Sequence, residues 1–300
     1  MTHAITTIGT GAAPGTCGEI VQGQFNAEEN FLVTFPVDLW STVTIELDSR
    51  YTGITCIPPE KTKSCRAVHV LLAHLDVPDT GARLTFTSNI PVGKGMASST
   101  ADITAACRAV GDALGVAVSP ELISQIAVQI EPSDGNMYPG VVAYDHIGCR
   151  LIETLGPPPP ADLLVVDLGG EVDTLAYNQA PKSYTPEDFA AFQGAYELVK
   201  NGIRSGDLAL VGKAATFSAR LNQKLLYKPE LEALAVIAAT HQAHGVCIGH
   251  SGAIAALIFD PANPRISQAR AQITQDFPHL AAPYLIHSHT PDRTSQRIPL

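Results

Sequence analysis

The residues best suited to chemistry form a glycine- and serine-rich segment, residues 91–101, with the sequence PVGKGMASSTA. It follows a strand-like run, 82–90, and leads into a run of helical composition, 101–114. Glycines let the backbone turn tightly toward a ligand, and the free N–H groups that begin a helix favour an anion. The hydroxyls of Ser98 and Ser99 stand where a phosphate or its Mg²⁺ would bind. The segment therefore predicts a cradle for nucleotide phosphates.

This loop differs from the two best-known phosphate-binding patterns. It lacks the Walker A pattern, because Lys94 lies between two glycines and is not followed by a hydroxyl residue. It also lacks the third glycine of G-x-G-x-x-G. An ordinary turn before a serine-capped helix is the alternative interpretation. The residues predicted to bind the cofactor are Pro91, Gly93, Lys94, Gly95, Met96, Ala97, Ser98 and Ser99.

Two carboxylates follow the end of a second predicted helix. Ser119 is a hydroxyl N-cap and Pro120 suits the first helical position, while Pro132 forces the helix to end near Glu131. Glu131 and Asp134 then offer hard oxygen ligands for Mg²⁺, or a general base for an attacking hydroxyl. A turn that merely closes the helix would account for the same residues.

Two further glycine-containing segments lie far apart in the sequence. The first is 14–19 (PGTCGE), in which Glu19 is a candidate acceptor for a substrate hydroxyl or amine, unless it is only a solvated turn residue. The second is 245–253 (GVCIGHSGA), which otherwise reads as a turn between buried strands 246–248 and 255–259. Neither segment identifies a ligand by itself.

In their order along the chain, these four segments resemble the signatures of the GHMP kinases. Segment 91–101 resembles P-x-x-x-G-L-x-S-S-A-A, with Met96 and Thr100 as departures, and 245–253 resembles the third, C-terminal glycine loop. Segment 14–19 resembles P-G-[KR]…G-E, but Thr16 replaces the basic residue. Lys94 is a candidate to replace the missing cation.

The resemblance implies ATP-dependent phosphoryl transfer to a small alcohol, with Mg²⁺. It implies Asp134 and Lys94 as catalytic residues, and Ser99 and Glu131 as metal ligands. The implied substrate-binding residues are Thr16, Cys17, Gly18, Glu19, Asp134, Gly249, His250, Ser251 and Gly252.

Within these kinases, the wording of 14–23 (PGTCGEIVQG), 131–134 (EPSD) and 245–252 is most similar to the L-threonine kinases of cobamide side-chain synthesis. That similarity implies formation of L-threonine O-3-phosphate for cobalamin biosynthesis. Three alternatives remain open: a kinase for another small alcohol, such as a homoserine-like compound or a sugar; a ligand sensor without catalysis; and a GHMP-fold decarboxylase.

Strands mixed with helices without strict alternation predict an α+β protein. A proline run, 157–160, divides the chain. The resemblance implies a domain like ribosomal protein S5 domain 2 at 1–156 and a ferredoxin-like domain at 161–300. Other predicted helices are 66–75, 185–203, 229–243 and 267–276, and other strands are 39–47, 162–168 and 284–287.

Composition restricts the partners. A formal net charge of -10 argues against nucleic acid, which normally requires a basic face. The sequence also lacks an apolar run long enough to span a membrane, and its beginning lacks the features of a signal peptide. Because no two cysteines have metal-binding or redox-motif spacing, the thiols are predicted to be reduced in a cytoplasmic protein. The expected partners are therefore ATP and a small substrate, and a homodimer is left open.

Overall fold

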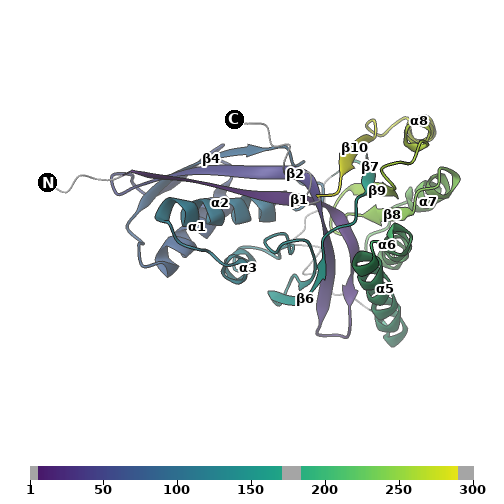
Figure 1. Ribbon diagram of the computed structural model, residues 1–300, viewed down its shortest axis with the longest axis horizontal. Helices are drawn as coiled ribbons and strands as arrows, with labels where there is room; N and C mark the ends of the chain where they lie inside the picture. Colours follow the sequence, from purple (N-terminus) through teal and green to yellow (C-terminus); the bar gives the residue numbers. More distant parts are fainter. Residues whose placement is uncertain (1–5, 171–183, 290–300) are drawn as a thin grey trace.

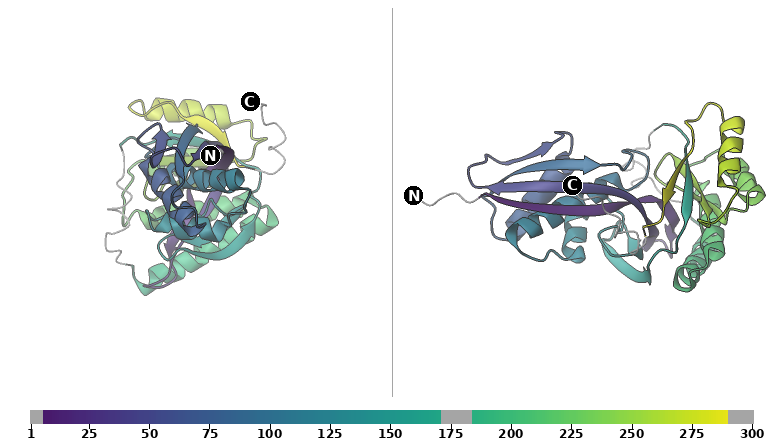
Figure 2. Two further views of the ribbon diagram at one scale, coloured as in Figure 1. Left: turned by 90° about the vertical axis from the view of Figure 1, so that its left-hand side faces the viewer. Right: turned by 45° about the horizontal axis from the view of Figure 1, so that its top comes forward.

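The computed structural model describes residues 6–170 and 184–289. Its main feature is a pair of long antiparallel strands, β1 (Thr7–Gln24) and β2 (Asn30–Asp48). Figures 1 and 2 show these strands extending from the helices of the N-terminal half into the part formed by the C-terminal half. The two longest described strands thus connect the two halves of the chain.

A single sheet contains all ten described strands, in the order β10-β7-β9-β8-β1-β2-β4-β3, with β5 paired to β2 and β6 to β5. Its halves join where Glu19 of β1 pairs with Ile248 of β8. The division at 1–156 and 161–300, parts of which lie outside the described residues, stays a prediction. The remaining strands are β3 (Ile54–Ile57), β4 (Gly81–Ser88), β5 (Val141–Asp145), β6 (Arg150–Gly156), β7 (Asp162–Asp167), β8 (Gly245–Ile248), β9 (Ile254–Phe259) and β10 (Tyr284–His287).

Helices cover the sheet in both halves, which confirms the predicted α+β class. Figure 1 shows α1 to α3 beside the long strands, and α5 to α8 in the part formed by the C-terminal half. The helices are α1 (Thr62–His74), α2 (Ser98–Leu114), α3 (Pro120–Val128), α5 (Pro186–Ser205), α6 (Leu208–Asn222), α7 (Leu231–Thr240) and α8 (Ile266–Asp276).

Small residues let α2 lie directly on β1. A Cβ atom on Gly9 would stand 2.3 Å from the Ala109 carbonyl oxygen, and one on Gly11 would stand 2.2 Å from that of Ala105. Any larger residue at these two glycines would push the helix away from the strand. This close packing fixes the position of α2 on the sheet, and the predicted phosphate loop leads into the first turn of that helix.

Helices α2 and α6 differ from the sequence prediction, as α1 does at its start. Helix α2 begins at Ser98 rather than at Ala101, because Ala97 takes a left-handed conformation (φ 57°) that reverses the chain just before the serines. Helix α6 was not predicted at all. The Asp207 carboxylate caps it by accepting hydrogen bonds from two N–H groups of the first turn, and Gly212 interrupts its helical composition. Close approach to β8 explains that glycine, since its Cβ would lie 2.3 Å from the His244 backbone.

The prediction of reduced thiols was wrong for one pair. Cys56, in β3, and Cys65, in α1, form a disulfide, with their Cα atoms 6.5 Å apart. The turn from strand to helix brings the two residues together, and a separation of nine residues gave no recognisable motif. Cys17, Cys107, Cys149 and Cys247 are free.

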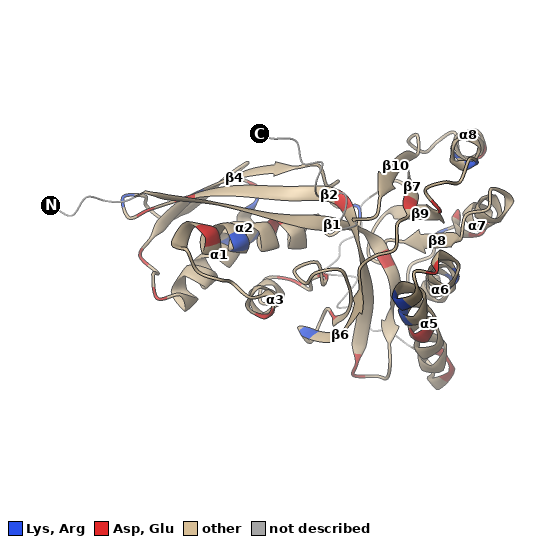
Figure 3. Cartoon of the chain, in the orientation of Figure 1, with Lys and Arg blue, Asp and Glu red and all other residues tan. Residues whose placement is uncertain are grey.

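Charge and hydropathy are unexceptional over most of the fold. In Figure 3 the Lys and Arg positions are dispersed over several elements. Among residues 6–170 and 184–289, no helix is long and apolar enough to cross a membrane. The candidate functional residues lie where loop 91–101, called the phosphate loop below, meets the long strands.

Candidate active site

A cavity of about 350 Å³ lies between the phosphate loop, the turn after α3 and the β1–β2 hairpin. Most of the residues predicted for phosphate, metal and proton transfer line this one space. The lining residues are Glu19, Gln22, Leu32, Lys63, Val92, Gly93, Gly95, Met96, Ala97, Ser98, Ser99, Thr100, Glu131, Pro132, Ser133, Asp134, His146 and Ser251.

Asp134 lies in the turn after α3 and faces two other carboxylates. Burial, followed by the negative charges of Glu19 and Glu131, raises the pKa of Asp134 to about 8. The Asp134 backbone N–H donates to the Thr100 hydroxyl at 3.3 Å, which fixes the turn against α2. A carboxylate whose pKa is close to neutrality is well matched to accepting a proton from an alcohol.

Ser99 and Glu131 meet at the start of α2, as expected for a shared ligand. The Ser99 hydroxyl donates to Glu131 Oε1, and Lys63 Nζ donates to Glu131 Oε2 at 2.5 Å. A hydroxyl and a carboxylate are hard oxygen donors of the kind that Mg²⁺ prefers. The described residues contain no cluster of three or more His, Cys, Asp or Glu that could hold a metal. The pair supplies two oxygen donors that suit Mg²⁺, and the other ligands of such an ion would be phosphate oxygens and water.

Lys63 is the cavity cation that the sequence reasoning missed. The helix was predicted to begin at Arg66, but α1 begins at Thr62, so that Lys63 occupies its first turn. No local pattern in the sequence marked Lys63, because only the fold brings the start of α1 beside the phosphate loop. Lys94, predicted to replace the missing cation, instead pairs with Asp167 at 2.9 Å. It does not line the cavity, so its catalytic role stays a prediction.

The other two predicted glycine segments, 14–19 and 245–253, hydrogen-bond to the backbone of the phosphate loop. Three backbone N–H groups donate to its carbonyl oxygens: Thr16 to Met96 at 3.1 Å, Gly18 to Gly95 at 3.2 Å, and Ala253 to Lys94 at 3.1 Å. Among the residues predicted to bind substrate, Glu19, Asp134 and Ser251 line the cavity. Those outside its lining are Thr16, Cys17, Gly18, Gly249, His250 and Gly252.

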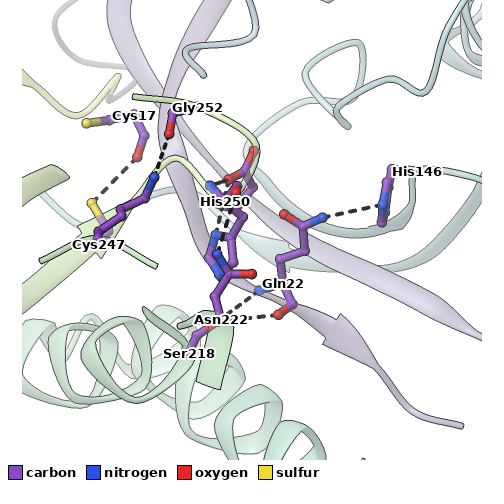
Figure 4. Close-up of polar contacts among 10 residues, drawn as sticks. Cys17, Gln22, His146, Ser218, Asn222, Cys247, His250 and Gly252 are labelled. Atoms are coloured by element: carbon purple, nitrogen blue, oxygen red, sulfur yellow. Dashed lines mark hydrogen bonds and ion pairs between the residues drawn. The ribbon is translucent and has the colours of Figure 1, made fainter. Parts of the chain in front are cut away.

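His250 is buried and holds Glu19. Its backbone N–H donates to Glu19 Oε2 at 2.8 Å, and its Nδ1 lies 3.2 Å from the same oxygen. Its Nε2 lies 3.0 Å from the hydroxyl of Ser218, a residue of the unpredicted helix α6. Figure 4 shows His250 between the long strand and that helix. Glu19 is therefore oriented by two segments that are distant from it in the sequence, the loop that carries His250 and helix α6.

Lys228 is a second cation that the sequence reasoning missed. Its side chain is buried, and Nζ donates to the Gly252 carbonyl at 2.7 Å. Burial lowers the pKa of this ammonium, while the nearby Glu19 carboxylate raises it. Lys228 therefore supports the loop at Gly252 from outside the cavity lining.

Several known proteins resemble this chain in sequence or in fold. A family model described as "GHMP kinases N terminal domain" matches residues 63–142. The chain is 33% identical over 269 residues to the L-threonine kinase of Salmonella typhimurium, covering 87% of this chain and 86% of that protein. It is 32% identical over 272 residues to the L-threonine kinase of Citrobacter freundii, covering 87% and 90%. Homoserine kinase from Cytophaga hutchinsonii has a similar structure, with a TM-score of 0.73, 17% identity, and 94% and 95% coverage.

Proposed function

This chain belongs to the GHMP kinases and is a small-molecule kinase, and from that premise we propose that it phosphorylates the side-chain hydroxyl of L-threonine with ATP. The observation that carries the proposal is the single cavity shared by the phosphate loop, the Ser99–Glu131 pair and Asp134. Its threonine-phosphorylating relatives, at 32–33% identity over most of the chain, favour that acceptor.

Phosphoryl transfer depends mainly on positioning and on stabilising charge at the transferring group. Loop residues Gly93 to Ser98 would supply backbone amides to the phosphates, at the N-terminus of α2. Lys63 would place a positive charge beside the phosphates. It would thus replace the basic residue of the P-G-[KR] signature, whose position is occupied by Thr16 in this chain. Asp134 would accept the proton of the attacking hydroxyl, and Glu19, held by His250, would orient the amino acid.

Ser99 and Glu131 are the residues that would hold Mg²⁺. When bound, the ion would neutralise negative charge on the phosphate oxygens. Lys63 forms an ion pair with Glu131 and so offsets part of the negative charge beside Asp134. The product would be L-threonine O-3-phosphate, and we propose that it serves cobalamin biosynthesis in the cytoplasm.

The test is an ADP-release assay with Mg·ATP against L-threonine, L-serine, L-homoserine, galactose and mevalonate, with each product identified by mass. We expect saturable turnover of L-threonine to its O-phosphate. Turnover with another acceptor alone would keep the kinase and discard threonine. ATP binding without turnover of any acceptor would favour a ligand sensor instead.

Replacing Glu131 by Gln is expected to raise the Mg²⁺ concentration needed for half-maximal activity by at least about 10-fold. This is the lower limit of the loss in metal affinity seen when residues around a bound metal are changed. The amide keeps a partner for Ser99 but loses the charge that attracts the ion. Mg²⁺ titration of activity, with Mn²⁺ binding to the ATP complex, measures this change. Glu153→Gln is the control, since Glu153 pairs with Lys200 and Arg204 outside the cavity. Equal titration curves for wild type and Glu131→Gln would remove Glu131 from the metal site.

A further inference from the structure

Gln22, in β1, has a buried polar atom that lacks a partner. Its side chain is 6% exposed and lines the cavity, yet Oε1 receives no hydrogen bond from any described residue. An unpaired buried carbonyl oxygen costs free energy, and native proteins keep few of them. The missing donor is therefore expected to arrive with a ligand.

The rest of the Gln22 residue is held in place. Its side-chain nitrogen donates to His146 Nε2 at 3.4 Å, and its backbone N–H donates to the Ser218 hydroxyl at 3.1 Å. Ser218 in turn contacts His250, which holds Glu19, so Gln22 and Glu19 belong to one network (Figure 4). With the amide nitrogen already engaged, the oxygen is the end of the side chain available to a ligand.

Adjacent strands place these groups in one row. Gln22 pairs with Leu32 of β2, and Leu32 pairs with Tyr144 of β5, two residues before His146. Leu32 and His146 line the cavity together with Gln22. The subsite is thus built on the sheet, which positions it rigidly.

The charges around the cavity favour a cationic donor. Its lining includes three carboxylates, those of Glu19, Glu131 and Asp134. The only lysine among its described lining residues, Lys63, is already paired with Glu131. A ligand ammonium would supply both the missing hydrogen bond and a compensating positive charge.

We propose that Gln22 is a specificity-determining residue whose side-chain oxygen accepts a hydrogen bond from the α-ammonium group of an amino acid substrate. The inference rests on the proposed function, because it assigns a head-group contact for the same acceptor. His146 orients the amide, and the subsite separates hydroxy amino acids from hydroxy acids that lack the amine.

The test compares two ligands that differ only at that group. L-Threonine and (R)-3-hydroxybutyrate share the hydroxyl, methyl and carboxylate, but only threonine has an α-ammonium. Calorimetry would measure the binding of each to the wild type, to Gln22→Met and to Gln24→Met. Gln24 is the matched control because it is buried in the same strand, bonds to Asn30 and does not line the cavity.

We expect the wild type and Gln24→Met to bind threonine more tightly than (R)-3-hydroxybutyrate. In Gln22→Met the ratio of the two affinities should fall by about 10- to 100-fold, the range for a hydrogen bond to a charged group. An unchanged preference in Gln22→Met, equal weakening of both ligands, or no preference in the wild type would each overturn the proposal. Binding does not require turnover. If threonine binds in this way but is not phosphorylated, the proposed function fails while the Gln22 assignment stands.

Discussion

Replacing Asp134 by Asn is expected to lower kcat by about 10²- to 10⁴-fold, the usual contribution of a positioned acid or base. The amide matches the carboxylate in size but cannot take the proton of the attacking hydroxyl. Because Asp134 is surrounded by Glu19 and Glu131, removing its charge should also relieve repulsion and leave substrate binding intact. Steady-state kinetics with L-threonine and ATP measure the effect, and Asp112→Asn on the exposed side of α2 is the control. Near-normal turnover would indicate a mechanism without a base.

The pH dependence offers an independent test of the same residue. The protonated form dominates below the raised pKa, so kcat/KM is expected to increase with pH and level off above about 8. Asp134→Asn should lose this rising limb. If kcat/KM still rises with pH in Asp134→Asn, the ionisation of another residue is responsible.

The same raised pKa predicts the stability of the variant. Because the folded pKa lies above the ordinary value of 3.8, the contribution of Asp134 to stability is fully present below 3.8 and is lost as pH rises through about 8. Asp134→Asn should therefore be at least as stable as the wild type at pH 8. Thermal unfolding checks this, and a large loss of stability would attribute the kinetic defect to misfolding.

Replacing Gly252 by Ala is expected to lower kcat/KM for ATP by about 100-fold or more. A displacement of about 1 Å in the residues that position a reacting group reduces the rate by about that factor. The new Cβ would lie 2.4 Å from the Lys94 carbonyl oxygen and 2.5 Å from Gly95 Cα. Both are backbone atoms, so the two glycine loops would have to separate. That movement would disturb the hydrogen bond from Ala253 to Lys94 and the amides predicted to face the phosphates.

Gly194→Ala is the matched control for the glycine substitution. Gly194 lies in α5, and its Cβ would meet nothing within 4 Å. This change should leave ATP kinetics unaltered and stabilise the protein by roughly 0.4–1 kcal/mol. Calorimetric binding of an ATP analogue, with circular dichroism to verify folding, separates a loop defect from a folding defect. Wild-type affinity in Gly252→Ala would show that the contact between the loops is dispensable.

The sequence by itself determined features that depend on few neighbouring residues. Ser119 and Pro120 begin α3 as predicted, because capping and the fixed φ of proline act locally. Local patterns and their order along the chain also selected the 91–101 loop, Ser99 and Asp134 as candidates, and the structure places Ser99, Asp134 and most of the loop around one cavity. Their roles stay predictions. The α+β class followed from the same patterns, since hydrophobic periodicity reflects local geometry.

Tertiary structure decided which of these residues share a site. Glu19 and His250 are 231 residues apart, and Gln22 and Ser218 are 196 apart, so no local rule could pair them. Lys94 was the candidate for the missing cation, and the structure pairs it with Asp167 of β7, while α1 brings Lys63 into the cavity lining. Local propensity acts over a few residues, whereas a cavity is formed by the packing of distant segments. The elements could therefore be read from the sequence, while the contacts that tune Asp134, Glu19 and Gln22 could not.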